Sequence, residues 1–255
     1  SKQLKGTEKR DKYKVYGELI NTYGYNLEPG SKELTALNYY TNEEITIPLD
    51  PTQTPGENAQ RYFAKYNKQK RTFEALTELI QETADDIQYL ESISNALDIA
   101  LNEADLAQIK EELMQSGYIR RKHTKKKVKL TSKPMHYISS DGYDMYVGKN
   151  NLQNEELTFS FANGNDWWFH AKGAPGSHVI VKSGGDELPD RTFEEAGRLA
   201  AYYSKNRGAD KVEIDYIQKK HVKKPNGAKP GFVVYYTNYS LVIDSDISNI
   251  KNVQD

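Results

Sequence analysis

The chain has 255 residues, a formal net charge of −1 and no cysteine, which excludes disulfides and thiol catalysis. Its length allows one or two domains, and no apolar run approaches the ~18 residues that would span a membrane. Hydrophobic residues make up only 37% of the chain and charged residues 28%. This balance is typical of a helical segment with little core joined to an ordinary globular part. Because the net charge of the whole chain is near zero, any nucleic-acid site must be a local patch of positive charge.

Residues 1–117 are predicted to form an antiparallel coiled-coil hairpin with a β insert at about 26–56. Tyrosines and Ile20, spaced by three or four residues, predict a first helix over 4–24. Alternating apolar residues over 34–49 predict two short strands. A long helix is predicted to begin near Glu57, because positions from Phe73 to Leu97 repeat by 3-4-3-4, and over 58–99 it would span ~60 Å. The first helix covers only half of it, so we expect the rest to pack on 104–114 or on chain that precedes Ser1.

Residues 118–131 form a basic junction, in which a run of Lys and Arg has no acidic residue. The long helix before it is also sorted by charge, because 61–71 hold five Lys or Arg and 74–112 hold eleven Asp or Glu. One interpretation is a solvated helix face and a soluble linker. The other is that the basic segments meet RNA while the acidic segment stays clear of it.

Residues 132–255 are predicted to form a mainly antiparallel α+β domain. A hairpin is expected to turn at 139–142, and a helix is expected over 192–206. The remaining periodic segments predict strands at 157–161, 167–169, 179–181, 211–218, 232–236 and 241–243.

The most distinctive segment is 166–180, which contains both tryptophans of the chain. Its pattern predicts a strand, a tight turn and a second strand. Gly173 and Gly176 would permit the turn, and Pro175 would stiffen it. Adjacent residues of a strand face opposite ways, so at least one tryptophan is expected in the core, although the pattern leaves open which one. We expect Lys172, Ser177 and His178 to face a partner.

An enzyme is the less favoured interpretation of the same segment. Asp166, His170 and His178 could bind a metal or act as acid and base. However, the chain has no HExxH motif, no paired-carboxylate motif and no phosphate-binding loop of the Walker type. We therefore expect no catalysis, no metal and no cofactor.

RNA binding accounts for more of these residues, because lysines and glycine-rich turns contact phosphates and aromatic rings stack on splayed bases. The alternative for each lysine run is a soluble loop. The predicted RNA-binding residues are Arg120, Arg121, Lys125, Lys126, Lys127, Lys149, Asn150, Trp167, His170, Lys172, Gly173, Gly176, Ser177, His178, Lys223, Lys224 and Lys229.

Four motifs resemble, in order and spacing, the C-terminal half of the NFACT family, whose bacterial members are called RqcH or fibronectin-binding protein A-like. The motifs are 57–68 (ENAQRYFAKYNK), 146–154, the 166–180 segment and 223–231 (KKPNGAKPG). The resemblance covers most of residues 8–245. It implies a coiled-coil arm followed by an NFACT-R domain, with 1–117 as the arm.

The resemblance also implies a partner. Proteins of the RqcH type bind stalled large ribosomal subunits with peptidyl-tRNA and recruit alanyl-tRNA for C-terminal tailing of the nascent chain. The expected partners are therefore the large subunit, rRNA and tRNA, in the cytoplasm. The family's tRNA-selecting N-terminal domain has no counterpart here, so we interpret the chain as a fragment that should not support tailing alone. Some Gram-positive members are described as fibronectin-binding surface proteins, which is the alternative function, although no anchor motif or fibronectin-binding repeat supports it.

Overall fold

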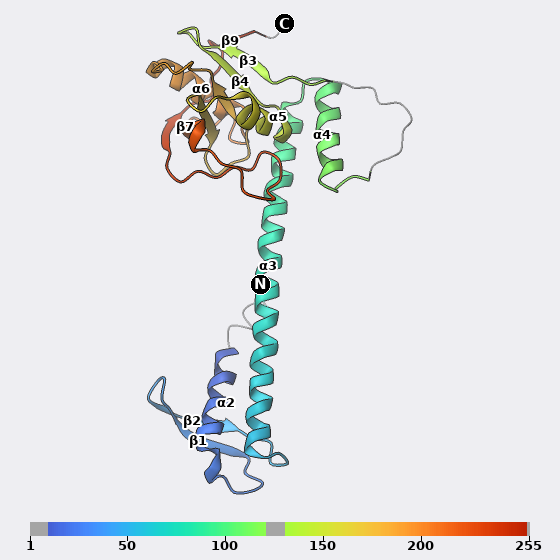
Figure 1. The fold of residues 1–255 in the computed structure, drawn as a ribbon, viewed down its shortest axis with the longest axis vertical. Coiled ribbons are helices and arrows are strands. Elements are labelled where there is room, and N and C mark those ends of the chain that lie inside the picture. The colour runs from blue at the N-terminus through green and yellow to red at the C-terminus, as the bar shows by residue number, and fades with distance from the viewer. Residues whose placement is uncertain (1–9, 121–130, 254–255) are drawn as a thin grey trace. The chain divides into compact units, whose positions relative to one another are not determined.

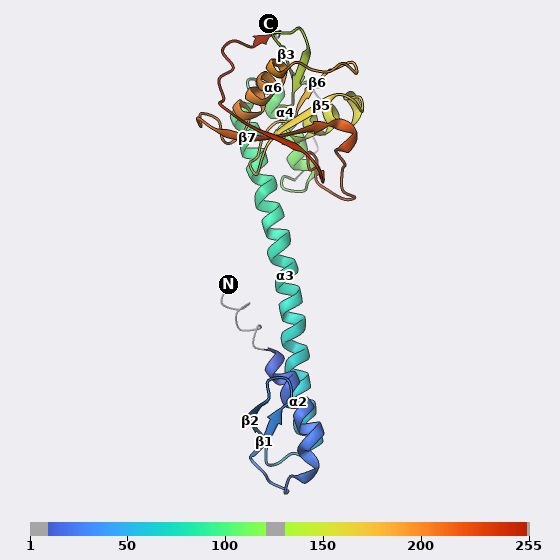
Figure 2. The same ribbon diagram turned by 90° about the vertical axis from the view of Figure 1, so that its left-hand side faces the viewer.

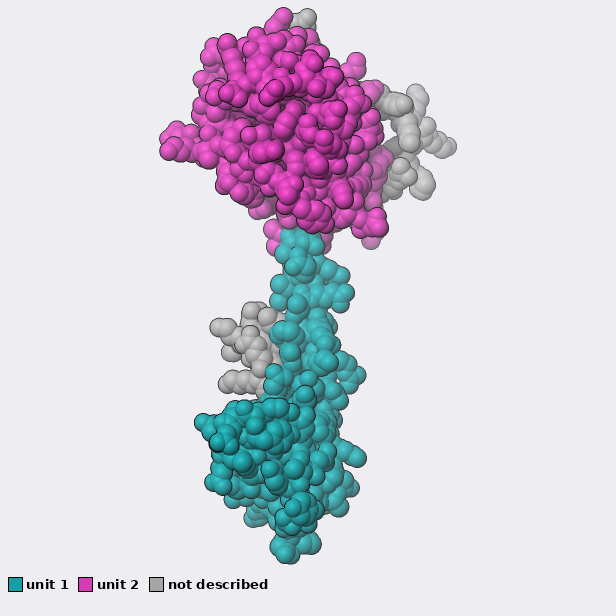
Figure 3. Space-filling model, turned by 60° about the vertical axis from the view of Figure 1, so that its left-hand side comes forward, with its two compact units in different colours: residues 1–85 teal, residues 86–255 magenta. Residues whose placement is uncertain are grey.

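The computed structural model describes residues 10–120 and 131–253. They divide into two compact units, 1–85 and 86–255, which Figure 3 colours separately. The long helix α3 (Pro55–Ile99) contributes to both. None of the helices in the described ranges is both long and apolar enough to cross a membrane.

The first unit packs one short helix and a two-stranded hairpin against the start of α3 (Figures 1 and 2). Its elements before α3 are α2 (Asp11–Tyr23), the 3₁₀ turn η2 (Gly24–Asn26), β1 (Glu33–Asn38) and β2 (Glu43–Pro48). β1 and β2 pair in antiparallel register. Leu19, Ile20 and Ile47 form its core with Tyr62. Thr54 and Glu57 exchange hydrogen bonds across the first turn of α3 as a capping box, which fixes the start of the helix near the predicted residue.

The predicted apolar stripe of α3 is not the face that this chain buries. Ile87, Leu90 and Leu97 are exposed. Tyr89, Ile93 and Ala96 are buried instead, and they form a cluster with Ile109 of α4 (Glu103–Gln115). The expected packing against 104–114 is therefore confirmed, but it uses a neighbouring face of the helix.

The second unit contains a seven-stranded sheet in which every neighbouring pair is antiparallel, which confirms the predicted α+β class. The strand order is β8-β7-β5-β6-β4-β3-β9. Helix α6 (Asp190–Tyr202) packs on one face (Figure 1). The strands are β3 (Met135–Ile138), β4 (Asp144–Val147), β5 (Trp167–Ala171), β6 (Val179–Val181), β7 (Val212–Gln218), β8 (Tyr239–Ile243) and β9 (Lys251–Asn252).

Two predicted strands are wrong. Residues 157–161 continue helix α5 (Asn151–Glu156) as the π-helical turn η3 (Leu157–Phe161). The Asn150 side chain caps this helix by accepting a hydrogen bond from the Gln153 amide, and the helix then runs through the alternating apolar residues. Residues 232–236 form only one isolated bridge, between Lys223 and Val234. The 3₁₀ turn η4 (Lys219–His221) precedes that loop.

Candidate nucleic-acid interface

Strand β5 divides the distinctive segment between the two faces of the sheet. Trp167 packs edge-on against Phe193 of α6 and is only half-buried. Trp168 is fully buried on the opposite face, where its ring contacts His170, His178 and Tyr235. The question that the sequence left open is thus answered, because Trp168 is the core tryptophan.

The turn after β5 is held by its backbone. Gly173 has φ +65°, which lies in the left-handed region that favours glycine. Gly176 has a different reason, because a Cβ there would lie 3.0 Å from Ser204 Cβ and 3.3 Å from Ser204 Cα. The Ser177 and Lys205 amides donate to the carbonyls of Tyr203 and Pro175, both at 2.9 Å. These bonds join the turn to the chain that follows α6, so its position is fixed.

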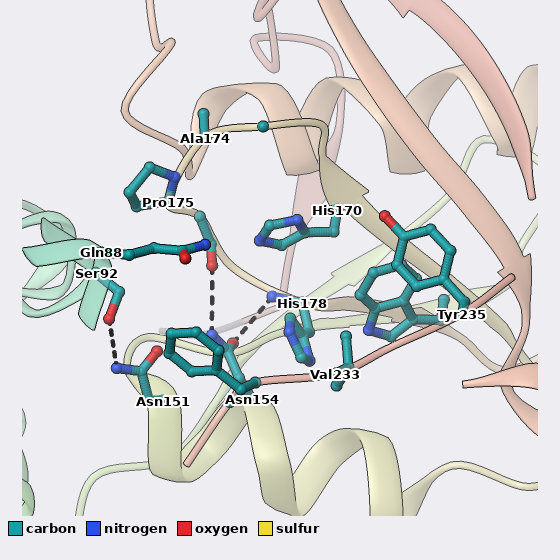
Figure 4. Close-up of a pocket in the computed structure, with 15 residues that line it drawn as sticks. Gln88, Ser92, Asn151, Asn154, His170, Ala174, Pro175, His178, Val233 and Tyr235 are labelled. Atoms are coloured by element: carbon teal, nitrogen blue, oxygen red, sulfur yellow. Dashed lines mark hydrogen bonds between the residues drawn. The ribbon is translucent and has the colours of Figure 1, made fainter. Parts of the chain in front are cut away.

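This turn closes one side of a pocket of about 250 Å³ on the sheet face opposite α6 (Figure 4). The other sides come from α3, α5, β5 and the loop at 231–235. Figure 4 shows His170 and His178 between the turn at Pro175 and the ring of Tyr235. Three segments that the sequence singled out separately, 146–154, 166–180 and 223–231, therefore meet here, with the last contributing Gly231.

Both histidines in the pocket are neutral at pH 7. Burial lowers the pKa of His170 to about 4. Burial, and then the nearby His170, lower the pKa of His178 well below its usual value. His178 shares a 2.8 Å hydrogen bond with Thr158 through Nδ1, and its amide donates to Asn154 Oδ1 at 2.9 Å. The rings lie edge to face with centroids 5.5 Å apart.

The arrangement does not assemble a metal centre from these residues. No group of three or more His, Cys, Asp or Glu within the described ranges is placed to hold a metal ion. Asp166 precedes β5, at the end of the strand away from the turn, and its carboxylate pairs with Lys182 at 2.5 Å. Asp166 therefore orders the chain before β5, away from the two histidines with which the sequence grouped it.

Four of the predicted RNA-binding residues are interior. Lys149 was expected to be a surface cation, but its side chain is 6% exposed and its Nζ lies 2.7 Å from Asp105 Oδ1 of α4. Asn150 is buried as the cap of α5. Ser177 and His178 were expected to face a partner, and both are buried because the chain enters β6 there. Only His178 among these four lines the pocket.

Most of the remaining lysines are exposed and have acidic neighbours. Lys172 pairs with Glu213 at 2.5 Å, and Lys224 pairs with Glu155 at 2.6 Å. Lys229 contacts Asp86 and lies 3.0 Å from the Tyr118 hydroxyl. Lys223 is exposed and forms no salt bridge with any residue in the described ranges. Arg120 is exposed, while the predicted residues Arg121, Lys125, Lys126 and Lys127 lie outside the described residues.

Several residues that line the pocket were not predicted as site residues from the sequence. Tyr235 was predicted to lie in a strand. It lies instead in the loop that lines the pocket, and its hydroxyl donates a 2.8 Å hydrogen bond to Asp215. Gln88 and Ser92 belong to α3, and no local pattern connects them to the distant segment. Asn154 lay in a motif of the family resemblance, but it was not singled out as a site residue.

The chain matches two models of one protein family. Residues 1–132 match the NFACT N-terminal and middle domains, and residues 133–236 match the NFACT protein RNA binding domain. The protein called "Rqc2 homolog RqcH" from Streptococcus pneumoniae (strain D39) is 42% identical over 254 residues, which are 99% of this chain and 46% of that protein. The protein of the same name from Bacillus subtilis is 40% identical over 256 residues, 98% of this chain and 44% of that protein.

A solved structure is also similar over most of its length. It is described as the C-terminal of the fibronectin/fibrinogen-binding protein from Streptococcus suis. It is 37% identical in sequence, has a TM-score of 0.71, and the match covers 98% of this chain and 91% of that one. The chain spans less than half the length of the curated relatives described above.

Proposed function

Because the chain belongs to the NFACT family, we propose that it is the RNA-binding half of a ribosome-associated quality-control factor. In this proposal the whole protein binds stalled large ribosomal subunits that carry peptidyl-tRNA. It supports recruitment of alanyl-tRNA for C-terminal tailing of the nascent chain. The present half contributes grip on rRNA and tRNA and no catalysis. A cytoplasmic location follows from that partner.

The observation that carries the proposal is the match of 133–236 to an RNA-binding domain. The physical features agree with it, because exposed lysines of the second unit, Lys172, Lys223 and Lys224, come from segments that also contribute to the pocket or adjoin it. Exposed lysines suit a phosphate backbone, which they contact without reading sequence. The basic junction at 118–131 is proposed, on its sequence, as a further phosphate-contacting segment.

The test is co-sedimentation of the purified chain with large ribosomal subunits over a range of salt concentrations. Contacts with several phosphates should give an affinity that falls steeply with salt, with a logarithmic slope of about −0.7 to −0.9 per phosphate. Substituting Lys223 by Ala should make that slope shallower by about 0.7 to 0.9, which is the contribution of one phosphate contact. Absence of binding at low salt would refute the proposal.

Fibronectin binding is a second candidate, because the similar solved structure from Streptococcus suis is described as part of a fibronectin/fibrinogen-binding protein. The two candidates separate in one experiment. Saturable fibronectin binding by a chain that does not bind ribosomes at low salt would favour the second.

A further inference from the structure

The pocket closed by the turn at 173–176 has an unusual charge composition for a site in an RNA-binding domain. None of the described residues that line it is Lys, Arg, Asp or Glu. Its two histidines are neutral near pH 7, because burial lowers the pKa of both. A phosphate has nothing cationic to pair with inside, and a carboxylate or an ammonium group likewise has no opposite charge.

What the pocket offers instead is flat rings and neutral hydrogen-bonding groups. The rings of His170, Phe232 and Tyr235 are partly exposed at its walls. Beneath them lies Trp168, whose ring stacks on His170 with centroids 5.7 Å apart and planes 16° from parallel. A neutral imidazole both donates and accepts. His178 already uses Nδ1 in its bond with Thr158, so pairing with the edge of a flat heterocycle falls to His170, while the rings stack on its face.

One buried group of the pocket lacks a partner among the residues that the structure describes. The indole Nε1 of Trp168 is buried and forms no hydrogen bond with any of them. A buried donor left unpaired costs free energy, and such groups in native proteins call for an explanation. A ligand with an acceptor atom that enters the pocket and shifts His170 or Tyr235 slightly would supply the missing partner.

Cations lie just outside this neutral interior. Lys172 is exposed and directly precedes Gly173 of the pocket wall. Lys223 is also exposed, and its backbone pairs with Val234, which lies between the wall residues Val233 and Tyr235. The site therefore has neutral rings within and two lysines at its rim, of which Lys172 is paired with Glu213 and Lys223 forms no salt bridge with any residue in the described ranges. This arrangement is complementary to a single nucleotide, whose base is flat and neutral and whose phosphate is anionic.

We propose that this pocket receives one unpaired RNA base, extruded from its strand, while Lys172 and Lys223 hold the adjoining phosphates. The proposal rests on the proposed RNA-binding function and adds to it a site where a base is recognised. The domain would then make two kinds of contact with RNA, one with the phosphate backbone and one with a base. Lysines outside the pocket supply affinity for any phosphate backbone, and the pocket supplies preference for single-stranded RNA with an intact base.

The experiment compares two fluorescein-labelled RNA strands of equal length and charge, a hexaadenylate and a hexamer in which every base is removed. Affinity is measured by anisotropy at low salt. The protein carries Trp167→Phe, so that Trp168 is its only tryptophan and its emission can be followed with unlabelled strands. We expect the hexaadenylate to bind roughly 5- to 150-fold more tightly, which is the range for stacking one base, and to change the Trp168 emission.

Three variants show whether the base preference arises in the pocket. Tyr235→Ala removes a pocket wall, and Tyr236→Ala removes the next ring along, which is 85% exposed and outside the pocket. Only the first should abolish the preference for the hexaadenylate. Gln88→Phe gives a second route that does not disturb the sheet, because Gln88 is an exposed residue of α3 whose larger replacement would fill the pocket. Thermal unfolding of each variant checks that it folds.

The outcomes distinguish the two proposals. Equal binding of both strands, with no change in Trp168 emission, would overturn the base pocket and leave RNA binding intact. A base preference that survives both Tyr235→Ala and Gln88→Phe would also overturn the pocket. Failure of both strands and of large ribosomal subunits to bind would refute the RNA-binding function itself.

Discussion

The buried pair between Lys149 and Asp105 gives a prediction that separates a structural role from an RNA-binding one. Lys149 Nζ lies 2.7 Å from Asp105 Oδ1, and both side chains are almost fully covered. Lys149→Met keeps most of the side-chain volume but leaves the carboxylate buried without its cation. Breaking a buried pair on one side costs roughly 3–5 kcal/mol of unfolding free energy.

We expect the lower end of that range, about 3 kcal/mol, because Asp105 keeps two other hydrogen bonds. Ser132 Oγ donates to it at 2.6 Å, and the Leu101 amide donates at 2.9 Å. For a domain of this size, that loss lowers Tm by roughly 6–12 °C. Lys133→Met is the matched control, because it makes the same charge change at an exposed lysine and should barely move Tm.

The pH dependence of the same variant follows from Asp105. Burial works to raise the pKa of this carboxyl, but hydrogen bonds from Lys149, Ser132 and Leu101 outweigh it and hold the pKa below its usual value. A lowered pKa in the folded state contributes stability above the unfolded value of about 4, and that contribution is lost as the pH falls through the folded pKa. The Tm difference between wild type and Lys149→Met should therefore be largest near neutral pH and shrink below about pH 4.

Calorimetry measures these differences, and a double-mutant cycle with Asp105→Leu isolates the pair. In that background Lys149→Met should cost much less than it does alone. RNA affinity, measured well below Tm, should be unchanged by Lys149→Met. The reasoning would be refuted by a variant that keeps its Tm and loses RNA binding, since that is the behaviour of a surface contact.

Three further predictions concern the distinctive segment. Trp168→Ala should cost roughly 3–5 kcal/mol in denaturant unfolding, because the ring is fully buried; a much smaller cost would contradict its place in the core. Lys172→Ala should weaken RNA binding with Tm nearly unchanged, whereas Glu213→Ala, which frees the same lysine, should not weaken binding; parallel losses in both variants would mean that the pair itself matters. His170→Gln should flatten the dependence of stability on pH between about 4 and 6.5, because a histidine with a lowered pKa contributes stability that is lost over that window as the pH falls, at up to about 1.4 kcal/mol per pH unit; an unchanged profile would show that another group titrates there.

Local patterns predicted much of this fold. The start of the long helix near Glu57 and the hairpin turn at 139–142 each follow from a few adjacent residues, and the structure confirms both. The segment 157–161 shows the limit of such patterns. Its alternating apolar residues favour a strand, but the cap at Asn150 starts a helix that continues through them. Period-two alternation over five residues does not outweigh a helix already begun upstream.

The candidate site was predictable in its ingredients but not in its assembly. His170, Gly173 and Gly176 were singled out, and all three line the pocket. The sequence could not place Gln88 there, because its position in the pocket wall depends on where α3 packs in the second unit. It also could not tell that Lys149 is interior. A lysine in a polar segment resembles any surface lysine until its partner, here Asp105, is known.

If the second unit grips ribosomal RNA around the turn at 173–176, crosslinking to the large subunit should place nucleotides on that turn. The chain would be bound to large ribosomal subunits at low salt, irradiated, digested and analysed by mass spectrometry for peptides that carry a nucleotide. We expect nucleotide-bearing peptides from 170–182 and 219–236, and we expect them to be lost at high salt. Crosslinks confined to the first unit, or none at all despite binding, would contradict that expectation.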